Sequence, residues 1–201
     1  MIKISEILEI GSNKKYIDNL IKECKKENII PFIGAGMSVP IYELWGDFLI
    51  DVSKKSFDSE FPKKIWKRIE AGEYECAASD VLEELGEGEF YSALTDAFSK
   101  EKIKTVKNMA VNLLPDIFHG FVITTNYDRI LEKVYRDNNN SFEEVSYHID
   151  ESDRMNELWT RGNAENRHYL FKIHGDIETE RSLVLTEEKY KEKYAPGTIF
   201  R

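Results

Sequence analysis

The sequence predicts an α/β fold in which a doubly wound parallel sheet carries an inserted small helical module. Two observations lead to this prediction. Short apolar runs alternate along the chain with segments whose apolar residues recur at helical spacing, as expected when helices cover a parallel sheet. Between residues 57 and 104 the chain becomes rich in Glu, Lys and Ala and only the helical spacing continues, which indicates an all-helical insertion. The expected frame therefore comprises residues 1–56 and 105–201.

The length and composition fit one acidic globular domain. The 201 residues carry 28 Lys and Arg against 37 Asp and Glu, for a net charge of −9. Because phosphate backbones repel an acidic surface, we expect no direct nucleic-acid binding. The chain begins without the apolar core of a signal peptide, and no stretch reaches the roughly 18 apolar residues of a membrane span. We therefore expect a cytoplasmic protein without a membrane partner.

Before residue 57 the sequence predicts a helix, a strand and a second helix. Residues 12–27 place apolar side chains on one helical stripe, formed by Tyr16, Ile17, Leu20, Ile21 and Cys24. The apolar run at 29–33 ends abruptly at glycine, which is typical of a buried parallel strand, although Pro31 favours its start or a sheet edge. After Pro40, residues 44–54 are expected to form a helix.

The expected insertion, at about 57–104, divides into three helical pieces. Their apolar positions are Ile65, Trp66 and Ile69, then Ala77, Val81, Leu82 and Leu85, and then Phe90, Leu94 and Phe98. Gly72 and the Gly86-Glu87-Gly88 run separate these groups, because glycine readily ends a helix. We expect the acid-rich faces of these helices to be solvated surface.

The second half of the frame alternates again between helices and strands. Residues 106–114 are expected to form a helix that Pro115 stops, and the β-branched and aromatic run 121–125 is the clearest strand. The remaining expected elements are a helix at 127–136, strands at 144–149, 168–173 and 183–185, and a helix at 187–194. A sheet of this kind should continue with a closing strand, so we expect a fragment of a longer protein or a sheet completed by another element.

Chemically useful residues follow three of the expected strands at the point where each strand ends. In an open parallel sheet these carboxyl ends line the ligand crevice. The first motif is Gly34-Ala35-Gly36-Met37-Ser38, whose glycines allow backbone N–H groups to approach a phosphate closely. A dinucleotide fingerprint would have glycine in place of Val39, so this motif taken alone is equally well explained by a tight turn.

The second and third motifs offer polar side chains. In Thr124-Thr125-Asn126-Tyr127-Asp128, Asn126 brings a donor and an acceptor suited to ribose hydroxyls or a positioned water. Asp128, taken alone, is more simply explained as an acid that stabilises the start of the next helix. In Lys172-Ile173-His174-Gly175-Asp176, His174 has an ordinary pKa of about 6.5, which suits general acid–base chemistry near neutral pH.

The three motifs in this order resemble those of the sirtuin superfamily, and most closely its bacterial sirtuin-like branch of NAD hydrolases. The resemblance implies a Rossmann-like fold with the NAD pyrophosphate on the glycine loop and the nicotinamide-ribose end at the asparagine and aspartate. The implied cofactor-binding residues are Gly34, Ala35, Gly36, Ser38, Thr125, Asn126 and Asp128. The implied catalytic residues are Asn126, Asp128 and His174, with His174 as the general base.

The resemblance implies hydrolysis of NAD to nicotinamide and ADP-ribose, as in antiphage defence proteins that deplete NAD. Protein-deacylating sirtuins carry a four-cysteine zinc module after the His-Gly motif and glutamine where Thr125 stands, whereas here no cysteine follows Cys76. We therefore expect no zinc and no other metal. Protein deacylation, ADP-ribosyl transfer and non-catalytic binding of NAD or ADP-ribose remain as alternatives. Because NAD depletion is toxic, we expect gating by homo-oligomer assembly, a partner or a second domain.

Overall fold

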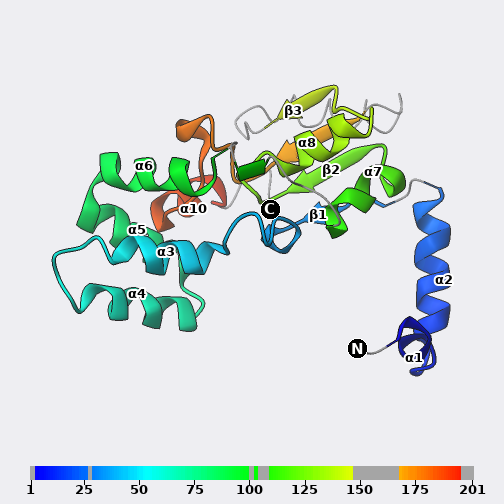
Figure 1. Cartoon of the computed structure of the whole chain (residues 1–201), viewed down its shortest axis with the longest axis horizontal. Helices are drawn as coiled ribbons and strands as arrows, with labels where there is room; N and C mark the ends of the chain where they lie inside the picture. The colour runs from blue at the N-terminus through cyan, green and yellow to red at the C-terminus, as the bar shows by residue number, and fades with distance from the viewer. Residues whose placement is uncertain (1–2, 27–28, 100–101, 104–108, 147–167, 196–201) are drawn as a thin grey trace.

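The computed structural model describes residues 3–26, 29–99, 102–103, 109–146 and 168–195 of the chain. A sheet of four parallel strands lies at its centre, in the order β1-β2-β4-β3 (Figure 1). The strands are β1 (Phe32–Ile33), β2 (Phe121–Thr124), β3 (Glu144–Ser146) and β4 (Tyr169–Lys172). A parallel sheet whose strands alternate with helices confirms the predicted α/β class.

Side chains of β2 and β4 alternate between two apolar clusters, as the pleat of a strand requires. Val122 and Leu170 pair across the two strands and belong to the larger core. Phe121 and Phe171 point to the opposite face and belong to a smaller cluster. Both faces of these central strands are therefore buried, which explains why their sequences are continuous apolar runs.

The three strands that precede the motifs end at one level of the sheet. Ile33, the last residue of β1, pairs with Thr124, the last residue of β2. Thr124 in turn pairs with Lys172, the last residue of β4. The three motif segments therefore leave the sheet side by side, at its carboxyl edge.

Beyond the N-terminal pair, the helices of the expected frame are α3 (Trp45–Ser53), α7 (Leu114–Ile117), α8 (Ile130–Asp137) and α10 (Glu187–Lys193). In α8 the apolar stripe at helical spacing is buried, and it consists of Ile130, Leu131, Val134 and Tyr135. Phe48 and Leu49 of α3 enter the same core. These two helices connect the sheet to the rest of the molecule through one continuous apolar cluster.

Residues 61–97 form the helices α4 (Phe61–Glu70), α5 (Tyr74–Leu85) and α6 (Glu87–Ala97). Each packs on the next, and α5 also contacts α3 and α10. Gly86 ends α5 with φ +78°, a conformation that glycine adopts at low cost, so the predicted break occurs there. In Figure 1 these helices lie at the end of the molecule opposite α1 and α2. That they form a separate inserted module stays a prediction.

The strand expected at residues 183–185 is wrong. The run is buried, but it forms no strand, and Val184 donates its N–H to the carbonyl of His174 over 3.0 Å. It follows the 3₁₀ turn η4 (Glu180–Ser182). An apolar run of three residues carries no periodicity, so burial in a packed loop and pairing in a ladder give the same sequence pattern.

The expectation that Pro115 stops a helix is also wrong. Pro115 lies in the first turn of α7, where its missing N–H costs nothing, so it begins a helix instead. The four residues before α7 form the 3₁₀ turn η3 (Ala110–Leu113). Of the segments expected to be regular, residues 27, 106–108 and 147–149 lie outside the described part of the chain.

The helix predicted at 12–27 is present as α2 (Asn13–Cys24), preceded by the short α1 (Ile4–Leu8). Neither helix contributes a buried residue. The predicted apolar stripe of α2 is exposed, with 66 % of Tyr16 and 55 % of Leu20 accessible to solvent. Figure 1 shows both helices set apart from the sheet. The helical pattern was therefore right, but the stripe lies outside the described core.

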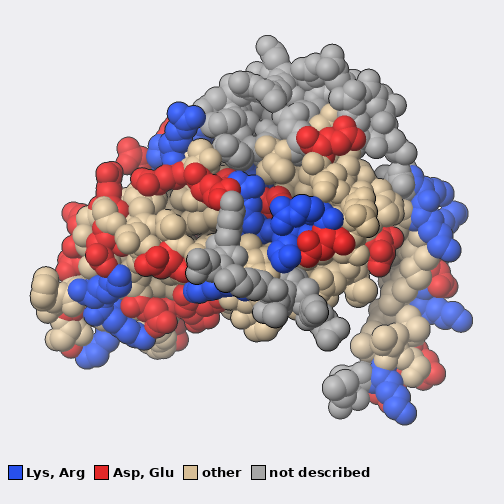
Figure 2. All heavy atoms as spheres, turned by 45° about the horizontal axis from the view of Figure 1, so that its top comes forward, with Lys and Arg blue, Asp and Glu red and all other residues tan. Residues whose placement is uncertain are grey.

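Figure 2 shows Lys and Arg side chains interspersed with Asp and Glu over the face in view. On this face, charges of the two signs therefore neutralise one another locally. Among the described residues, no helix combines the length and the apolar character needed to cross a lipid bilayer.

Candidate functional site

The three motifs meet at a cavity of about 500 Å³. The predicted site residues that line it are Ala35, Ser38, Thr125, Asn126, Asp128 and His174. Gly34 and Gly36 are not among its lining residues, but they belong to the same loop, which continues as the 3₁₀ turn η1 (Ala35–Met37). Segments far apart in the sequence thus surround one space, because their strands end at one level.

A chain of hydrogen bonds joins the first motif to the second. Asn126 Nδ2 donates to Gly34 O over 3.2 Å and to Ser38 Oγ over 2.9 Å. Ser38 Oγ donates to Asp128 Oδ2 over 2.7 Å. Asp128 Oδ1 accepts the N–H of Ile130, the first residue of α8, over 2.9 Å. Asp128 therefore performs the helix-start role that its position predicts and also fixes the hydroxyl that orients Asn126.

Burial raises the pKa of the Asp128 carboxyl above its ordinary value, because a charged carboxylate loses its solvation there. Hydrogen bonds from Ser38 and Ile130 and the positive charge of Lys172 act in the opposite direction. The net direction is upward, so this carboxyl binds a proton more readily than an exposed aspartate does.

The side-chain oxygen of Asn126 is an unused acceptor. Asn126 is 7 % exposed, and its Oδ1 has no hydrogen-bond partner among the described residues. Both of its donor contacts hold the amide in place, so the oxygen cannot turn to another group without breaking them. A buried acceptor without a partner costs about 1–3 kcal/mol, which a ligand donor in the cavity would offset.

His174 borders the cavity among aromatic rings. The ring centroids of Tyr190, Tyr194 and Tyr127 lie 5.2, 6.0 and 6.4 Å from that of His174. Tyr190 Oη lies 3.4 Å from His174 Nδ1. Burial lowers the pKa of His174 to about 4, because the cation loses solvation among these rings. The imidazole is therefore neutral at pH 7 and can accept a proton.

Apart from Tyr127, the rest of the cavity comes from residues outside the three motifs. Acidic side chains line it at Glu43, Asp47 and Glu75, and aromatic ones at Trp45, Tyr42, Tyr74, Phe98, Tyr127 and Tyr190. None of the described residues that line it is Lys or Arg. The side chains therefore suit an uncharged or cationic end of a ligand, and an anionic part would need backbone N–H groups. The sequence did not predict this part of the cavity, because packing into the core already explains the apolar spacing of its helices.

The glycines of the first motif leave open space. A Cβ atom added at Gly34 or at Gly36 would meet no described atom within 4 Å. Gly34 has φ −112°, which any residue adopts. Neither packing nor backbone conformation therefore requires glycine at Gly34, and packing does not require it at Gly36. Close approach of a ligand to the loop would explain both residues.

No group of three or more His, Cys, Asp or Glu side chains in the described part of the chain is placed to bind a metal ion. The two cysteines, Cys24 and Cys76, are both free and partly exposed. The expected absence of zinc stays a prediction.

Comparison with known proteins bears on this arrangement. The family model of the SIR2-like domain matches residues 120–201, the range that contains the second and third motifs. The chain is 26 % identical over 196 residues to the NAD(+) hydrolase ThsA of Bacillus cereus (strain MSX-D12), an alignment that covers 96 % of this chain and 36 % of ThsA. The chain thus spans about a third of the length of that relative. Together with the three motifs, these matches show that the chain is similar to proteins of the bacterial sirtuin-like family.

Proposed function

We propose that this chain binds NAD in the motif cavity and hydrolyses the bond between nicotinamide and ribose, releasing nicotinamide and ADP-ribose. The observation that carries the proposal is that Asn126, whose buried Oδ1 has no hydrogen-bond partner among the described residues, lines the same cavity as His174. An amide acceptor and a neutral imidazole on residues that line one cavity suit a reaction of water with a sugar. The likeness to an NAD(+) hydrolase supports NAD as the substrate.

The chemistry needs a base but no acid. The bond to be broken joins ribose C1′ to a cationic pyridinium nitrogen, so nicotinamide leaves as a neutral molecule with the bonding electron pair. The transition state resembles an oxocarbenium ion, as in glycoside hydrolysis. A water oxygen bonds to C1′, and its proton passes to the neutral imidazole of His174. Asn126 Oδ1 accepts a hydrogen bond from a ribose hydroxyl or from that water.

The remaining residues would orient the substrate. Asp128, through Ser38, fixes the amide of Asn126, so its contribution is to the geometry of the ribose end. The acids that line the cavity outside the motifs, including Glu43 and Asp47, would favour a cationic nicotinamide ring by charge. The pyrophosphate would lie over the loop that contains Gly36, where backbone N–H groups replace the absent Lys and Arg side chains.

Replacing Gly36 by alanine tests the place of the pyrophosphate. The added Cβ meets no described atom of the protein, so the melting temperature should stay at the wild-type value. It would occupy space that the phosphates need, so we expect KM for NAD to rise about tenfold, or roughly 1.4 kcal/mol. Steady-state kinetics over a range of NAD concentrations measures this. Gly88→Ala is the matched control, because its Cβ also meets no described atom and it lies on α6. An unchanged KM in Gly36→Ala would place the phosphates elsewhere.

The function itself is tested by chromatography of NAD incubated with the purified protein. Hydrolysis predicts stoichiometric nicotinamide and ADP-ribose in the absence of any peptide. Nicotinamide release that requires an added acyl-peptide or a protein acceptor would contradict hydrolysis and favour deacylation or ADP-ribosyl transfer. Binding of NAD by calorimetry without nicotinamide release would favour a regulatory, non-catalytic domain.

We also propose a wider role as an NAD-depleting effector of antiphage defence. The frame would comprise residues 1–56 and 105–201, and the insertion at about 57–104 would contribute Tyr74, Glu75 and Phe98 to the cavity.

Because continuous NAD depletion harms the cell, we propose that self-association, a partner or a second domain gates the activity. A rise in specific activity with protein concentration, or after infection in cells that express the full-length protein, would support gating.

A further inference from the structure

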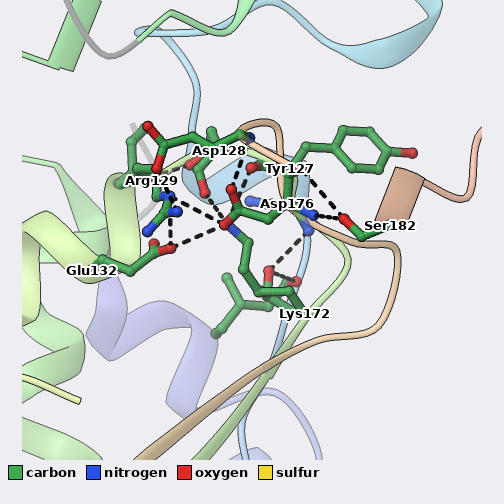
Figure 3. Close-up of polar contacts among 12 residues, drawn as sticks. Tyr127, Asp128, Arg129, Glu132, Lys172, Asp176 and Ser182 are labelled. Carbon is green, nitrogen blue, oxygen red and sulfur yellow. Dashed lines mark hydrogen bonds and ion pairs between the residues drawn. The ribbon is translucent and has the colours of Figure 1, made fainter. Parts of the chain in front are cut away.

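A lysine is fully buried beside the cavity. Lys172, the last residue of β4, has 0 % of its surface exposed. Figure 3 shows its ammonium group at the centre of a set of oxygen atoms. Nζ lies 2.6 Å from Asp128 O, 2.9 Å from Asp176 Oδ2, and 3.1 Å from both Tyr127 O and Glu132 Oε1. An ammonium group has only three N–H donors, so all of them are engaged within the protein.

Two of these acceptors belong to the loop that carries the second motif. The carbonyls of Tyr127 and Asp128 follow Asn126 directly, and Lys172 precedes His174 by two residues on β4. A single side chain therefore joins the backbone of the Asn126–Asp128 loop to the end of β4, two residues before His174. The N–H of Ile177 also donates to Tyr127 O over 3.1 Å, at the same junction.

The other acceptors form a charged cluster with Arg129. We call Lys172, Asp176, Glu132 and Arg129 the Lys172 cluster. Arg129 Nε lies 3.1 Å from Asp176 Oδ2 and 3.6 Å from Glu132 Oε1. Burial raises the pKa of the Glu132 carboxyl, and the charges of Lys172 and Arg129 lower it. Each buried charge thus faces an opposite one, which offsets much of the cost of removing it from water.

Asp176 connects the cluster to the turn after His174. It is 0 % exposed, and its Oδ1 accepts the N–H of Glu178 over 2.9 Å. Its own N–H donates to Ser182 Oγ over 3.0 Å. Asp176 therefore shapes the turn through one oxygen and bonds Lys172 through the other, so that a displacement of either side of the junction affects both.

We propose that Lys172 is a positioning residue that sets the Asn126–Asp128 loop and His174 at the relative distance needed for cleavage. This inference rests on the proposed function. A buried ion pair often contributes no more stability than apolar residues of the same volume, so stability alone is a weak reason for a lysine here. An apolar side chain could fill the space, but it could neither donate to the two loop carbonyls nor place a positive charge beside Asp128.

The charge of Lys172 gives the proposal a second, independent consequence. Lys172 lowers the pKa of Asp128. Burial and the charges of Asp128 and Glu132 in turn raise the pKa of Tyr42, so these titratable groups interact in one buried region. Loss of the ammonium should therefore raise the pKa of Asp128 further. The hydrogen bond from Ser38 to Asp128 depends on an accepting carboxylate oxygen, so protonation of Asp128 should lower the rate. The acid limb, which is the fall of the rate at low pH, should therefore move to higher pH in a variant without the ammonium group.

The test compares Lys172→Met with Arg129→Met. Arg129 pairs with the same two carboxylates, yet among the contacts of the described residues it has no bond to the carbonyls of Tyr127 or Asp128. We expect Lys172→Met to lower kcat for nicotinamide release about 100-fold, the effect of an ångström-scale misplacement, with a smaller change in KM. We expect Arg129→Met to keep kcat within about threefold, and the acid limb to move only in Lys172→Met.

The outcomes separate the positioning role from simple stabilisation. Equal losses of kcat in both variants, or a loss in Lys172→Met confined to KM, would overturn the proposal. If Lys172→Met does not fold, Lys172→Gln takes its place, because its amide can still donate to one loop carbonyl; its kcat should fall at least tenfold, and a wild-type kcat would overturn the proposal.

Amide hydrogen exchange keeps this inference distinguishable from the proposed function. If the wild type releases no nicotinamide, the proposed function fails, but exchange in residues 125–130 can still be measured because it needs no turnover. Faster exchange of these amides in Lys172→Met than in Arg129→Met supports the junction described above. Equal exchange rates in the two variants would overturn it.

Discussion

His174→Ala should lower the rate of nicotinamide release from NAD by about 10²–10⁴-fold, the usual contribution of a general base. In the proposed mechanism the neutral imidazole receives the proton of the attacking water, and His174 is the one histidine among the described residues that line the cavity. The binding of NAD should persist, since the glycine loop is unchanged. Single-turnover chromatography with excess enzyme measures the chemical step directly.

The pH profile provides a second measurement on the same residue. Because burial lowers the pKa of His174 to about 4, the imidazole stays neutral as the pH falls through the ordinary histidine value. The wild-type rate should therefore show no loss centred on the ordinary histidine pKa of about 6.5, and it should fall only at lower pH, where His174 and Asp128 become protonated. A fall of the rate with a midpoint near pH 6.5 would mean that the imidazole is solvated, contrary to its aromatic surroundings.

Two variants control this prediction. His168 is also buried, with its pKa lowered to about 4, but it packs against Tyr135 and Phe142 and does not line the cavity. His168→Phe should therefore keep the rate of nicotinamide release. Asn126→Ala removes the unpartnered acceptor and should reduce the rate with His174 intact. Wild-type NAD consumption in both His174→Ala and Asn126→Ala would make the assignment of the site wrong.

The meeting of the three motifs could be predicted from the sequence because it depends on local patterns alone. Each motif directly follows a short apolar run, and parallel strands present their carboxyl ends at one edge. The structure bears this out through the pairing of Ile33 with Thr124 and of Thr124 with Lys172. The roles of Asn126, Asp128 and His174 stay predictions, but their proximity is now an observation.

The other wall of the cavity could not be predicted, since long-range packing decides it. Trp45 and Tyr74 stand in helices whose apolar spacing is the same whether a side chain enters the core or borders a cavity. Lys172 shows the same limit more sharply: a lysine at the end of a strand is usually solvated, and only the tertiary arrangement of Glu132 and Asp176 around it makes a buried ammonium group tolerable. The exposed stripe of α2 is the converse case, an apolar pattern without a described core to enter.

Gly175→Ala should lower the free energy of unfolding by about 3–5 kcal/mol. Losses of this size are typical of substitutions that cause steric overlap with the backbone or backbone strain. Gly175 has φ +89°, a conformation that L side chains rarely adopt. A Cβ at this position would lie 2.2 Å from Ser182 O and 2.8 Å from Ser182 Oγ. The first of these atoms belongs to the backbone, so the clash cannot be relieved by turning a side chain. Urea unfolding followed by circular dichroism measures the loss.

The consequence for activity follows from what the turn holds together. Moving Ser182 away from Gly175 breaks the bond from Asp176 N–H to Ser182 Oγ, and Asp176 is the partner of Lys172. The variant should therefore lose nicotinamide release at temperatures where its circular dichroism is still that of the folded protein, because His174 is displaced before the core unfolds. Gly36→Ala is the matched control, with the opposite result: wild-type stability and weakened binding of NAD. If Gly175→Ala unfolded at the wild-type urea concentration, the tight contact between the His174 turn and residue 182 would be wrong, and with it the path by which Asp176 fixes the junction.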